Sequence, residues 1–248
     1  MIEARSIAFR HGTGPWLFND LSFSLREGQT LVLLGRNGRG KTTMLKCIAG
    51  LLKPSAGEIR CDGIIGYVPQ SFAPAFSYSV FDVVLMGRAR HVGLFSNPTA
   101  ADRDRASAAL EELGIGGFAR RSVATLSGGE RQLVLIARAL ASDADVLLLD
   151  EPAAALDFRN QATMLSTLRR LATQRGLTIV MTTHEPTHAL EIADRAVLLH
   201  DIGRVQEGAV EYVCTEANLS DLYGMQMKRL NDGGSASAHI VADYSSVR

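Results

Sequence analysis

The stretch Gly35-Arg36-Asn37-Gly38-Arg39-Gly40-Lys41-Thr42-Thr43 decides the fold of this chain. It matches the pattern G-x-x-x-x-G-K-[ST] and lies between an apolar run at Thr30–Leu34 and a helical pattern at Thr42–Ala49. Glycines let backbone N–H groups close around phosphate oxygens, and the helix N-terminus adds the positive end of its dipole. We therefore predict a nucleotide-phosphate site at residues 35–43, with Lys41 on the β- and γ-phosphates and the Thr42 hydroxyl on Mg²⁺.

The composition is that of a globular protein, with 248 residues, 46% of them apolar and 21% charged. The 26 basic and 26 acidic residues balance, which does not favour bulk nucleic-acid binding. The 3 cysteines show no metal-ligand spacing and are interpreted as core or neutral thiols in a reducing compartment. The sequence enters a strand pattern at Ile2 without a basic-then-apolar leader, and no apolar run approaches the ~20 residues of a bilayer span. We therefore expect neither secretion nor a membrane-spanning segment.

Two kinds of strand pattern predict two sheets. Alternating or half-apolar runs indicate an antiparallel sheet on one flank, from Ile2–Phe9, Leu17–Leu25 and Glu58–Arg60. Short continuous apolar runs indicate a parallel sheet that is covered on both faces. These runs are Thr30–Leu34, Ile65–Val68, Val146–Leu149, Thr178–Thr182 and Ala196–Leu199. Helices are predicted between them at Thr42–Ala49, Asn160–Thr173 and Thr187–Ile192, with Gly50 and Gly176 at helix ends.

Between Gln70 and Ser127 the pattern becomes helical. Val80–Met86 is an apolar helix, and residues 99–102 read as a capping box that opens a helix over Ala100–Leu113. We therefore predict a helical lobe over about residues 71–126, inserted in a single domain that spans residues 1–230. Residues 231–248 have little apolar content and include Gly233-Gly234-Ser235-Ala236-Ser237, which predicts a mobile tail.

Four further motifs follow the glycine-rich stretch in a fixed order. They are Leu126-Ser127-Gly128-Gly129-Glu130-Arg131-Gln132, Val146-Leu147-Leu148-Leu149-Asp150-Glu151-Pro152, Ala155-Leu156-Asp157 and Thr182-Thr183-His184. Together the set resembles the ATPase domain of the ABC (ATP-binding cassette) superfamily over about residues 1–225, and LSGGE is its most specific element. The resemblance implies an α/β P-loop NTPase (RecA-like) core with an antiparallel β flank and an inserted helical subdomain. It also implies ATP and Mg²⁺ as cofactors.

Within that resemblance, four residues carry the hydrolysis of ATP. Asp150 ends an apolar strand, where its carboxylate would hold Mg²⁺ through water, and Glu151 would polarise the water that attacks the γ-phosphate. His184 ends another core strand on the same sheet edge and would contact the γ-phosphate and help position the water and Glu151. Gln70, where the core gives way to the helical lobe, would reach Mg²⁺ through its amide. Each of the four residues also has a purely structural interpretation. Asp150, Glu151 and His184 could simply end strands, and Gln70 could be an ordinary turn residue.

Ser127 has two compatible interpretations. Ser127 and Glu130 form a capping box for the helix over Glu130–Ala141. The same helix start, with Gly128 and Gly129, is also an anion site. The resemblance implies that it faces the γ-phosphate held by a second copy, so that two chains sandwich two ATPs. Asp157 is kept for the contact across this dimer, but Ala153 and Ala154 stand where the family commonly has Thr and Ser, which puts the cross-dimer hydrogen bonds in doubt.

The sequence leaves two candidates, His11 and Trp16, for the side chain that contacts adenine. The family usually stacks an aromatic side chain on the base, and the alignment places His11 there. Phe9 is interpreted as a core residue, and Trp16 is the competitor. Arg39 replaces a small residue inside the phosphate loop, and its side chain is expected to point away from the nucleotide.

One branch of the superfamily is favoured by local resemblance. Four segments resemble the importers of ferric siderophores, haem and cobalamin, with a related molybdate or tungstate branch. They are Phe72–Arg88 (particularly Tyr78–Arg88), Gly93–Ala109, Thr182–Pro186 and Leu222–Gly224. The resemblance implies a homodimer beneath two transmembrane permease subunits, at the cytoplasmic face of the inner or plasma membrane. A substrate-binding protein would be an indirect partner. A permease helix would dock between the core and the helical lobe.

Three other classes remain open. A soluble ABC ATPase of DNA repair, translation or iron–sulfur assembly is one, although the segment between Gln70 and Ser127 is too short for a long coiled coil. A scaffold that binds ATP without hydrolysis is opposed by the presence of Lys41, Glu151 and His184. The third is an exporter subunit with a separate permease.

Overall fold

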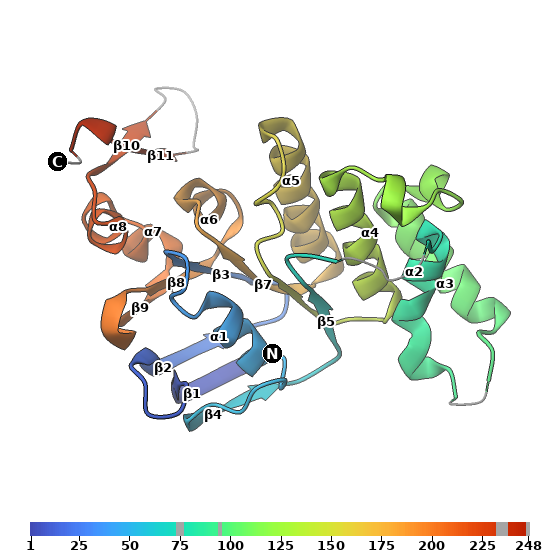
Figure 1. The fold of residues 1–248 in the computed structure, drawn as a ribbon, viewed down its shortest axis with the longest axis horizontal. Helices are drawn as coiled ribbons and strands as arrows, with labels where there is room; N and C mark the ends of the chain where they lie inside the picture. The colour runs from blue at the N-terminus through green and yellow to red at the C-terminus, as the bar shows by residue number, and fades with distance from the viewer. Residues whose placement is uncertain (73–76, 94–95, 232–237, 247–248) are drawn as a thin grey trace.

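The computed structural model describes residues 1–72, 77–93, 96–231 and 238–246. Its centre is a six-stranded sheet in the order β5-β6-β7-β3-β8-β9, flanked by a three-stranded sheet and by a helical lobe (Figure 1). The strands of the central sheet are β3 (Thr30–Gly35), β5 (Ile65–Val68), β6 (Val146–Leu149), β7 (Thr178–Thr183), β8 (Arg195–Leu199) and β9 (Val205–Ala209). The predicted α/β core with an antiparallel flank and an inserted helical region is confirmed.

The central sheet is parallel from β5 to β8, and β9 runs antiparallel to β8 at one edge. Successive residues of β3 enter two different cores: Leu31 and Leu33 face α1 (Lys41–Ile48) and the small sheet. Val32 and Leu34 face the core that includes α5 (Phe158–Arg175) and α6 (Pro186–Ile192). The continuous apolar pattern of these strands thus follows from burial on both faces.

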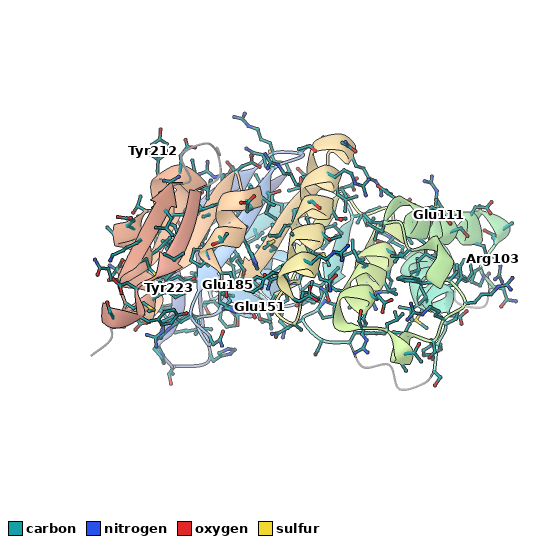
Figure 2. The ribbon with its side chains drawn as sticks, turned by 90° about the horizontal axis from the view of Figure 1, so that it is seen from above. Arg103, Glu111, Glu151, Glu185, Tyr212 and Tyr223 are labelled. Atoms are coloured by element: carbon teal, nitrogen blue, oxygen red, sulfur yellow. The ribbon has the colours of Figure 1, made fainter. Side chains whose placement is uncertain are left out.

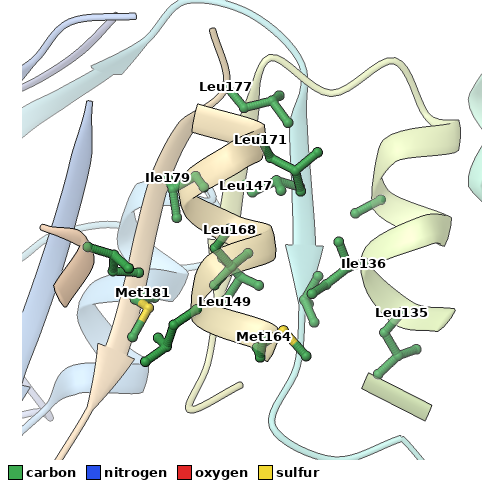
Figure 3. Packing of buried hydrophobic residues seen from close by; sticks show 14 of the residues in the cluster. Leu135, Ile136, Leu147, Leu149, Met164, Leu168, Leu171, Leu177, Ile179 and Met181 are labelled. Atoms are coloured by element: carbon green, nitrogen blue, oxygen red, sulfur yellow. The ribbon is translucent and has the colours of Figure 1, made fainter. Parts of the chain in front are cut away.

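Helix α5 covers the second of these faces. Figure 3 shows Leu168 and Leu171 of α5 beside Leu147 of β6 and Ile179 of β7. All four side chains are at most 1% exposed, and burial of such a side chain contributes about 1.5–3 kcal/mol. The helix ends at Gly176, whose φ of 72° lies in the left-handed region that glycine favours. This packing fixes where β6 and β7 end, and therefore where the residues after them lie.

The flank is the predicted antiparallel sheet, in the order β2-β1-β4. Its strands are β1 (Ile2–Arg10), β2 (Trp16–Leu25) and β4 (Ala56–Cys61). Ile2 pairs with Leu25 on one side and with Cys61 on the other. The turn between β1 and β2 carries His11 to the neighbourhood of the glycine-rich loop.

The helical lobe begins after β5 and continues through α4. Its elements are α2 (Val80–Leu85), η1 (Met86–His91), α3 (Ala100–Glu112), η2 (Gly116–Phe118), η3 (Val123–Thr125) and α4 (Gly128–Ala141). The predicted capping box is present: Thr99 caps α3, with Asp102 bonding back to it. Helix α4 packs so closely on the lobe that a Cβ added to Gly87 would lie 2.1 Å from the carbonyl oxygen of Arg138. In space the lobe therefore extends beyond residue 126, because α4 packs against it as well as against the core.

A buried arginine ties the lobe together. Arg88 is 7% exposed, and its guanidinium donates to Asp102 Oδ1 at 3.0 Å and to the carbonyl oxygen of Ala141 at 2.8 Å. A third bond reaches Asp143 Oδ2 at 2.5 Å. These bonds join η1 and α3 to the end of α4, where the chain turns toward β6.

The C-terminal segment, from residue 201 onward, forms secondary structure that continues into residues 231–248, where a mobile tail is predicted. Its elements are η4 (Asp201–Gly203), α7 (Val210–Val213), α8 (Glu216–Tyr223), β10 (Met227–Asn231), β11 (Ala238–Ala242) and η5 (Tyr244–Ser246). Strand β11 pairs antiparallel with β10, and its Ile240 is 5% exposed in the core shared with α6. One buried isoleucine and a strand partner therefore order a segment whose average composition is polar. Residues 232–237 and 247–248, with the glycine- and serine-rich run, lie outside the described residues.

Among the described residues, no helix combines the length and the apolar character that crossing a bilayer requires.

Candidate nucleotide site

The phosphate loop joins the end of β3 to the start of α1. Gly40, the residue before α1, has a φ of 90°, and a Cβ there would lie 2.9 Å from the Cβ of Leu17. A Cβ on Gly35 would lie 2.9 Å from the carbonyl oxygen of Leu199. Glycine is required at both positions, by conformation at Gly40 and by close approach at Gly35. The N–H groups of the first turn of α1 have no acceptor within the helix, which makes the loop a ready anion site.

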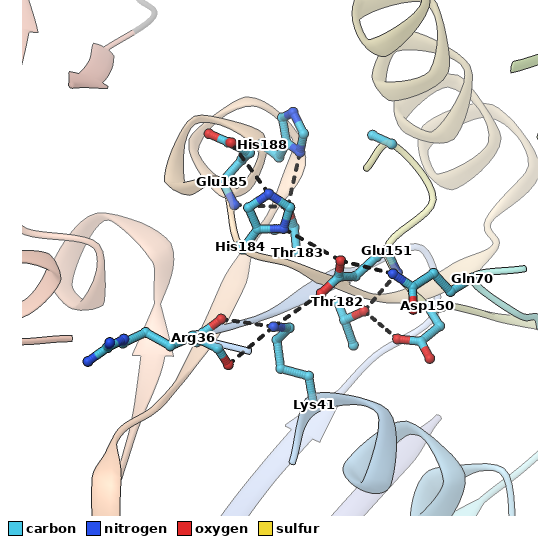
Figure 4. Close-up of polar contacts among 12 residues, drawn as sticks. Arg36, Lys41, Gln70, Asp150, Glu151, Thr182, Thr183, His184, Glu185 and His188 are labelled. Carbon is cyan, nitrogen blue, oxygen red and sulfur yellow. Dashed lines mark hydrogen bonds and ion pairs between the residues drawn. The ribbon is translucent and has the colours of Figure 1, made fainter. Parts of the chain in front are cut away.

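Lys41 is held over this loop. The side chain is 6% exposed, and its ammonium donates to the carbonyl oxygens of Gly35 at 2.9 Å and Arg36 at 3.4 Å. It also lies 3.1 Å from Oε1 of Glu151 (Figure 4). The structure therefore brings together the lysine and the carboxylate that the sequence assigns to phosphate binding and to water activation.

Arg39 points away from this site, as predicted. Its guanidinium lies 2.6 Å from Asp201 Oδ1, in the loop after β8. The side chains of Arg36 and Asn37 are exposed, and Gly38 has no side chain. The loop therefore presents mainly backbone to its concave side.

Asp150 lies at the carboxyl end of β6 and is 4% exposed. The hydroxyl of Thr42 donates to both of its carboxylate oxygens, at 3.0 and 2.8 Å. The hydroxyl of Thr182 donates to Oδ1 at 2.8 Å. A hydroxyl and a carboxylate at this spacing are hard oxygen donors of the kind Mg²⁺ prefers, so these residues fit the predicted metal.

Glu151 contacts several other residues of the site through its carboxylate. Its backbone has a φ of 47°, in the left-handed region that costs a residue with a side chain about 1–2 kcal/mol. Its carboxylate, in a side chain 12% exposed, contacts Lys41, Nδ1 of His184 at 3.5 Å and Nε2 of Gln70 at 3.4 Å. Three residues that are distant in sequence thus converge on one carboxylate (Figure 4).

Hydrogen bonds hold the segment around His184 in place. The hydroxyl of Tyr223, in α8, donates to the carbonyl oxygen of His184 at 2.9 Å. Thr183 accepts from the N–H of Glu185 at 3.1 Å and contacts Nδ1 of His188 at the same distance. Burial lowers the pKa of His188, so this imidazole stays neutral and acts as a hydrogen-bond partner. Figure 2 shows Glu151, Glu185 and Tyr223 close to one another on the core, far from Arg103 and Glu111 of the lobe.

A cavity of about 480 Å³ opens over the loop. Its lining comprises His11, Leu17, Asn37, Gly38, Gly40, Lys41, Thr42, Thr43, Gln70 and Glu151. Of the aromatic candidates, His11 lines this cavity, whereas Trp16 lies under the guanidinium of Arg10, 4.4 Å from ring centroid to Cζ. Phe9 is a core residue, 7% exposed, as interpreted from the sequence. The contact of His11 with adenine stays a prediction.

Ser127, Gly128, Gly129 and Asp157 do not line this cavity. The predicted capping box is present at the start of α4: Ser127 N donates to Glu130 Oε2 at 2.8 Å, and Glu130 N donates to Ser127 Oγ at 3.3 Å. A hydrogen bond from the Ser127 backbone, together with Arg121, lowers the pKa of Glu130. Asp157 caps α5 by accepting from Asn160 N at 2.8 Å, and a Cβ on Gly129 would meet Leu156 and Asn160. The two motifs thus lie next to each other, on a surface separate from the phosphate loop of the same chain.

Two residues of this site were not predicted. The sequence predicts Thr182 only as the end of a strand, and Tyr223 only as part of a segment that resembles one branch of the family. The available signal for Thr182 was a hydroxyl in a strand of buried residues, since a buried hydroxyl needs partners. No local signal places Tyr223 beside His184, because the contact joins segments 39 residues apart.

Comparison with known proteins assigns the family. A model of the ABC transporter family matches residues 18–154. The molybdate import ATP-binding protein MolC of Haemophilus influenzae is 40% identical over 226 residues, 91% of this chain and 89% of that protein. The hemin import ATP-binding protein HmuV of Burkholderia ambifaria is 36% identical over 261 residues, 93% of this chain and 94% of that protein.

Solved structures of ABC transporter proteins are similar to this chain in fold and sequence. A chain of a transporter described as metal-chelate type, in an inward-facing conformation, has a TM-score of 0.93 and 38% identity, and the match covers 98% of this chain and 97% of that one. An ATP-binding cassette solved as a dimer with ADP and phosphate has a TM-score of 0.70 and 27% identity, over 85% of this chain and 99% of that one. The chain belongs to the ABC transporter family, as an ATP-binding subunit with ATPase activity coupled to transport.

Proposed function

We propose that this chain is the ATP-hydrolysing subunit of an importer, and that it drives uptake of a metal chelate such as an iron–siderophore, haem or cobalamin through separate permease subunits. The observation that carries the catalytic part is the convergence of Lys41, Gln70 and His184 on Glu151, directly above the phosphate loop. The resemblance over 98% of the chain to a transporter of metal-chelate type supports the transported class.

Binding of the triphosphate is assigned to the phosphate loop. Backbone N–H groups at the start of α1 and the ammonium of Lys41 would hold its oxygens. Because Lys41 already pairs with Glu151, the γ-phosphate competes for the ammonium and frees the carboxylate when it binds. Thr42 and Asp150 would hold Mg²⁺, with the amide of Gln70 at its edge. The bound ion neutralises charge that develops on the phosphate oxygens.

Hydrolysis is assigned to Glu151 and His184. A carboxylate that is 12% exposed and freed of Lys41 is placed to accept hydrogen bonds from a water above the γ-phosphate. His184 is 42% exposed, so its imidazole can reach both Glu151 and a phosphate oxygen. These two residues would orient the water, and the lysine and metal ligands would stabilise the transferred group.

The active unit we propose is a homodimer that sandwiches two ATPs. The support is that Ser127, Gly128, Gly129 and Asp157 lie outside the cavity formed by Lys41 and Glu151 of the same chain. A second copy would supply them, with the N-terminus of α4 facing the γ-phosphate. The dimeric cassette of the same fold, bound to ADP and phosphate, agrees with this arrangement. Two permease subunits would place the dimer at the cytoplasmic face of the membrane, and a substrate-binding protein would deliver the cargo.

Molybdate or tungstate is the second candidate for the cargo. It is favoured by the 40% identity to a molybdate import ATP-binding protein. No residue of this chain is assigned to contact the cargo, so the two candidates share the same site chemistry.

The experiment that separates them follows iron, cobalt, molybdenum and tungsten in cells that lack this protein. Each element is supplied as its chelate or oxyanion, and the strain is rescued with wild type or with Glu151→Gln. Loss of one element that wild type alone restores would identify the cargo and an ATP-driven importer. Unchanged levels of all four elements would contradict uptake and favour a soluble ABC ATPase or an exporter.

A further inference from the structure

One hydroxyl joins the two carboxylate residues of the site. Oγ1 of Thr182 donates to Asp150 Oδ1 at 2.8 Å and accepts from the backbone N–H of Glu151 at 2.8 Å. A hydroxyl has one proton to donate, so both bonds are made at once and in these directions. The hydroxyl of Thr182 therefore contacts the side chain of Asp150, the predicted metal ligand, and the backbone of Glu151, the predicted base (Figure 4).

The register of the parallel sheet creates this contact. Leu149, the last residue of β6, pairs with Met181 of β7. Asp150 and Thr182 each follow one residue later, so they lie side by side where β6 ends. Close packing holds this register, since Leu147 and Leu149 fill one core and Val146 and Leu148 fill the other.

The hydroxyl is a structural requirement of the strained turn after β6. Thr182 is 0% exposed, so water cannot replace it as a partner. The residue it holds, Glu151, has a φ of 47° and no glycine-like freedom to relieve it. Without an acceptor, the N–H of Glu151 would lose its bond, and the turn would lose one of the contacts that hold the unfavourable conformation.

The conformation of this turn determines where the carboxylate of Glu151 points. In the left-handed conformation, it reaches Lys41 at 3.1 Å, His184 at 3.5 Å and Gln70 at 3.4 Å. A turn that relaxed toward a right-handed or extended conformation would aim the side chain elsewhere. Loss of the bond to Asp150 would also remove one of the hydrogen bonds that orient its carboxylate, and the bonds from Thr42 would remain.

We propose that Thr182 is a positioning residue for ATP hydrolysis: its hydroxyl fixes the backbone of Glu151 and the carboxylate of Asp150 in one arrangement. The inference rests on the proposed role of Glu151 and adds a residue that does not line the cavity over the phosphate loop. It predicts that the hydroxyl matters for turnover more than for binding.

The test compares three substitutions in the full-length protein. Thr182→Val removes the hydroxyl and keeps the shape, and Thr182→Ser keeps the hydroxyl and removes the methyl group. Thr178→Val makes the same change at the other end of β7, where the hydroxyl of a residue 2% exposed donates to the carbonyl oxygen of Arg26 at 3.3 Å. The measurements are kcat and KM for ATP, the dissociation constant of ATP, and the amide exchange rate of Glu151 by ¹⁵N NMR.

Thr182→Val should lower kcat by about 10- to 100-fold, the effect of losing a hydrogen bond to a charged or strained group. The dissociation constant of ATP should change by less than about threefold. Thr182→Ser should recover most of kcat, and Thr178→Val should leave kcat near wild type. The Glu151 amide should exchange slowly in wild type and faster in Thr182→Val alone.

Three outcomes would overturn the proposal. They are wild-type kcat in Thr182→Val, equal losses of kcat in Thr182→Val and Thr182→Ser, and parallel losses in Thr182→Val and Thr178→Val. If Thr182→Val does not fold, amide exchange in the wild-type protein still tests the proposal. A Glu151 amide that exchanges as fast as an exposed amide would show that its hydrogen bond to the Thr182 hydroxyl is not formed. A wild-type protein without ATP hydrolysis would instead contradict the proposed function, and amide protection would still report on the contact.

Discussion

The ammonium of Lys41 lies 3.1 Å from the carboxylate of Glu151, and the two side chains are only 6% and 12% exposed. Each is therefore the main charged partner of the other in a site with little water. Removing one partner leaves a buried charge uncompensated, which costs more than the pair itself contributes. A bound triphosphate would take over the ammonium, so this ion pair links occupation of the phosphate loop to release of the predicted base.

The first prediction concerns Glu151→Gln. This variant should keep or strengthen ATP binding, because Lys41 keeps its carbonyl partners Gly35 and Arg36 and no longer pairs with a carboxylate that the γ-phosphate must displace. Turnover should fall by at least about 100-fold, the usual contribution of a general base. Phosphate release and nucleotide-binding titrations measure the two effects, and light scattering should show a more stable ATP-bound dimer.

Glu211→Gln is the matched control, since it makes the same change at an exposed position of α7, away from the site. It should turn over ATP at close to the wild-type rate. Multiple turnovers at the wild-type rate in Glu151→Gln would refute the assignment of the base.

The second prediction concerns the sandwich. Ser127→Arg should bind ATP and hydrolyse it poorly, because the arginine blocks the start of α4 without touching the cavity around Lys41. Thr125→Arg, at an exposed position nearby, should have a small effect.

Mixing inactive variants tests whether the site is shared. A dimer of one Ser127→Arg chain and one Glu151→Gln chain contains one intact composite site, so mixing should restore part of the hydrolysis. Complete absence of recovery, with mixed dimers shown to form, would argue against a site completed by the second chain.

The third prediction concerns Tyr223. Burial raises the pKa of Tyr223 well above its usual value, so the hydroxyl stays protonated and donates to the carbonyl oxygen of His184 throughout the neutral range. A hydrogen bond of this kind contributes about 0.5–1.5 kcal/mol, so Tyr223→Phe should lower kcat by about 2- to 10-fold. Steady-state kinetics should show KM for ATP little changed.

Tyr212→Phe is the control for that change, because Tyr212 is 77% exposed. Equal effects of the two substitutions would show that the bond to His184 does not influence turnover.

The fourth prediction concerns acid stability. Hydrogen bonds from Thr99, and then from Arg88, lower the pKa of Asp102 to about 2. Its folded-state pKa lies below the unfolded value of about 3.9, so it stabilises the fold above that value and this contribution is lost as pH falls toward about 2. Asp102→Asn should therefore lower the melting temperature at pH near 7, and the difference from wild type should shrink in acid.

Asp104→Asn, on the exposed side of α3, provides the comparison and should be close to wild type throughout. A deficit of Asp102→Asn that is equal at neutral and acid pH would contradict the charge-based account.

The fifth prediction separates the aromatic candidates for adenine. His11→Ala should weaken ATP binding, because His11 lines the cavity above the phosphate loop. Trp16→Ala should leave the affinity nearly unchanged, because its ring is covered by Arg10. Titration with a fluorescent ATP analogue measures both, and the reverse ranking would assign the base contact to Trp16.

Much of the fold follows from local patterns. The capping boxes at Ser127 and Thr99 and the glycine end of α5 are where the sequence predicts them, since each depends on a few neighbouring residues. For the polar segment after residue 230 the sequence predicts a mobile tail, whereas Ala238–Ala242 form strand β11. Strand β11 depends on pairing with β10 and on the burial of Ile240, and neither is visible in average composition.

The sequence itself determines the glycine-rich loop, the acids after β6 and the histidine after β7, because each motif specifies both the residue types and the local conformation. Which side chains meet was decided by the tertiary structure. The parallel register places Thr182 beside Asp150, and the packing of α8 brings Tyr223 to His184. These contacts depend on the burial of apolar faces that are distant along the chain, and such burial fixes distances that no local pattern specifies.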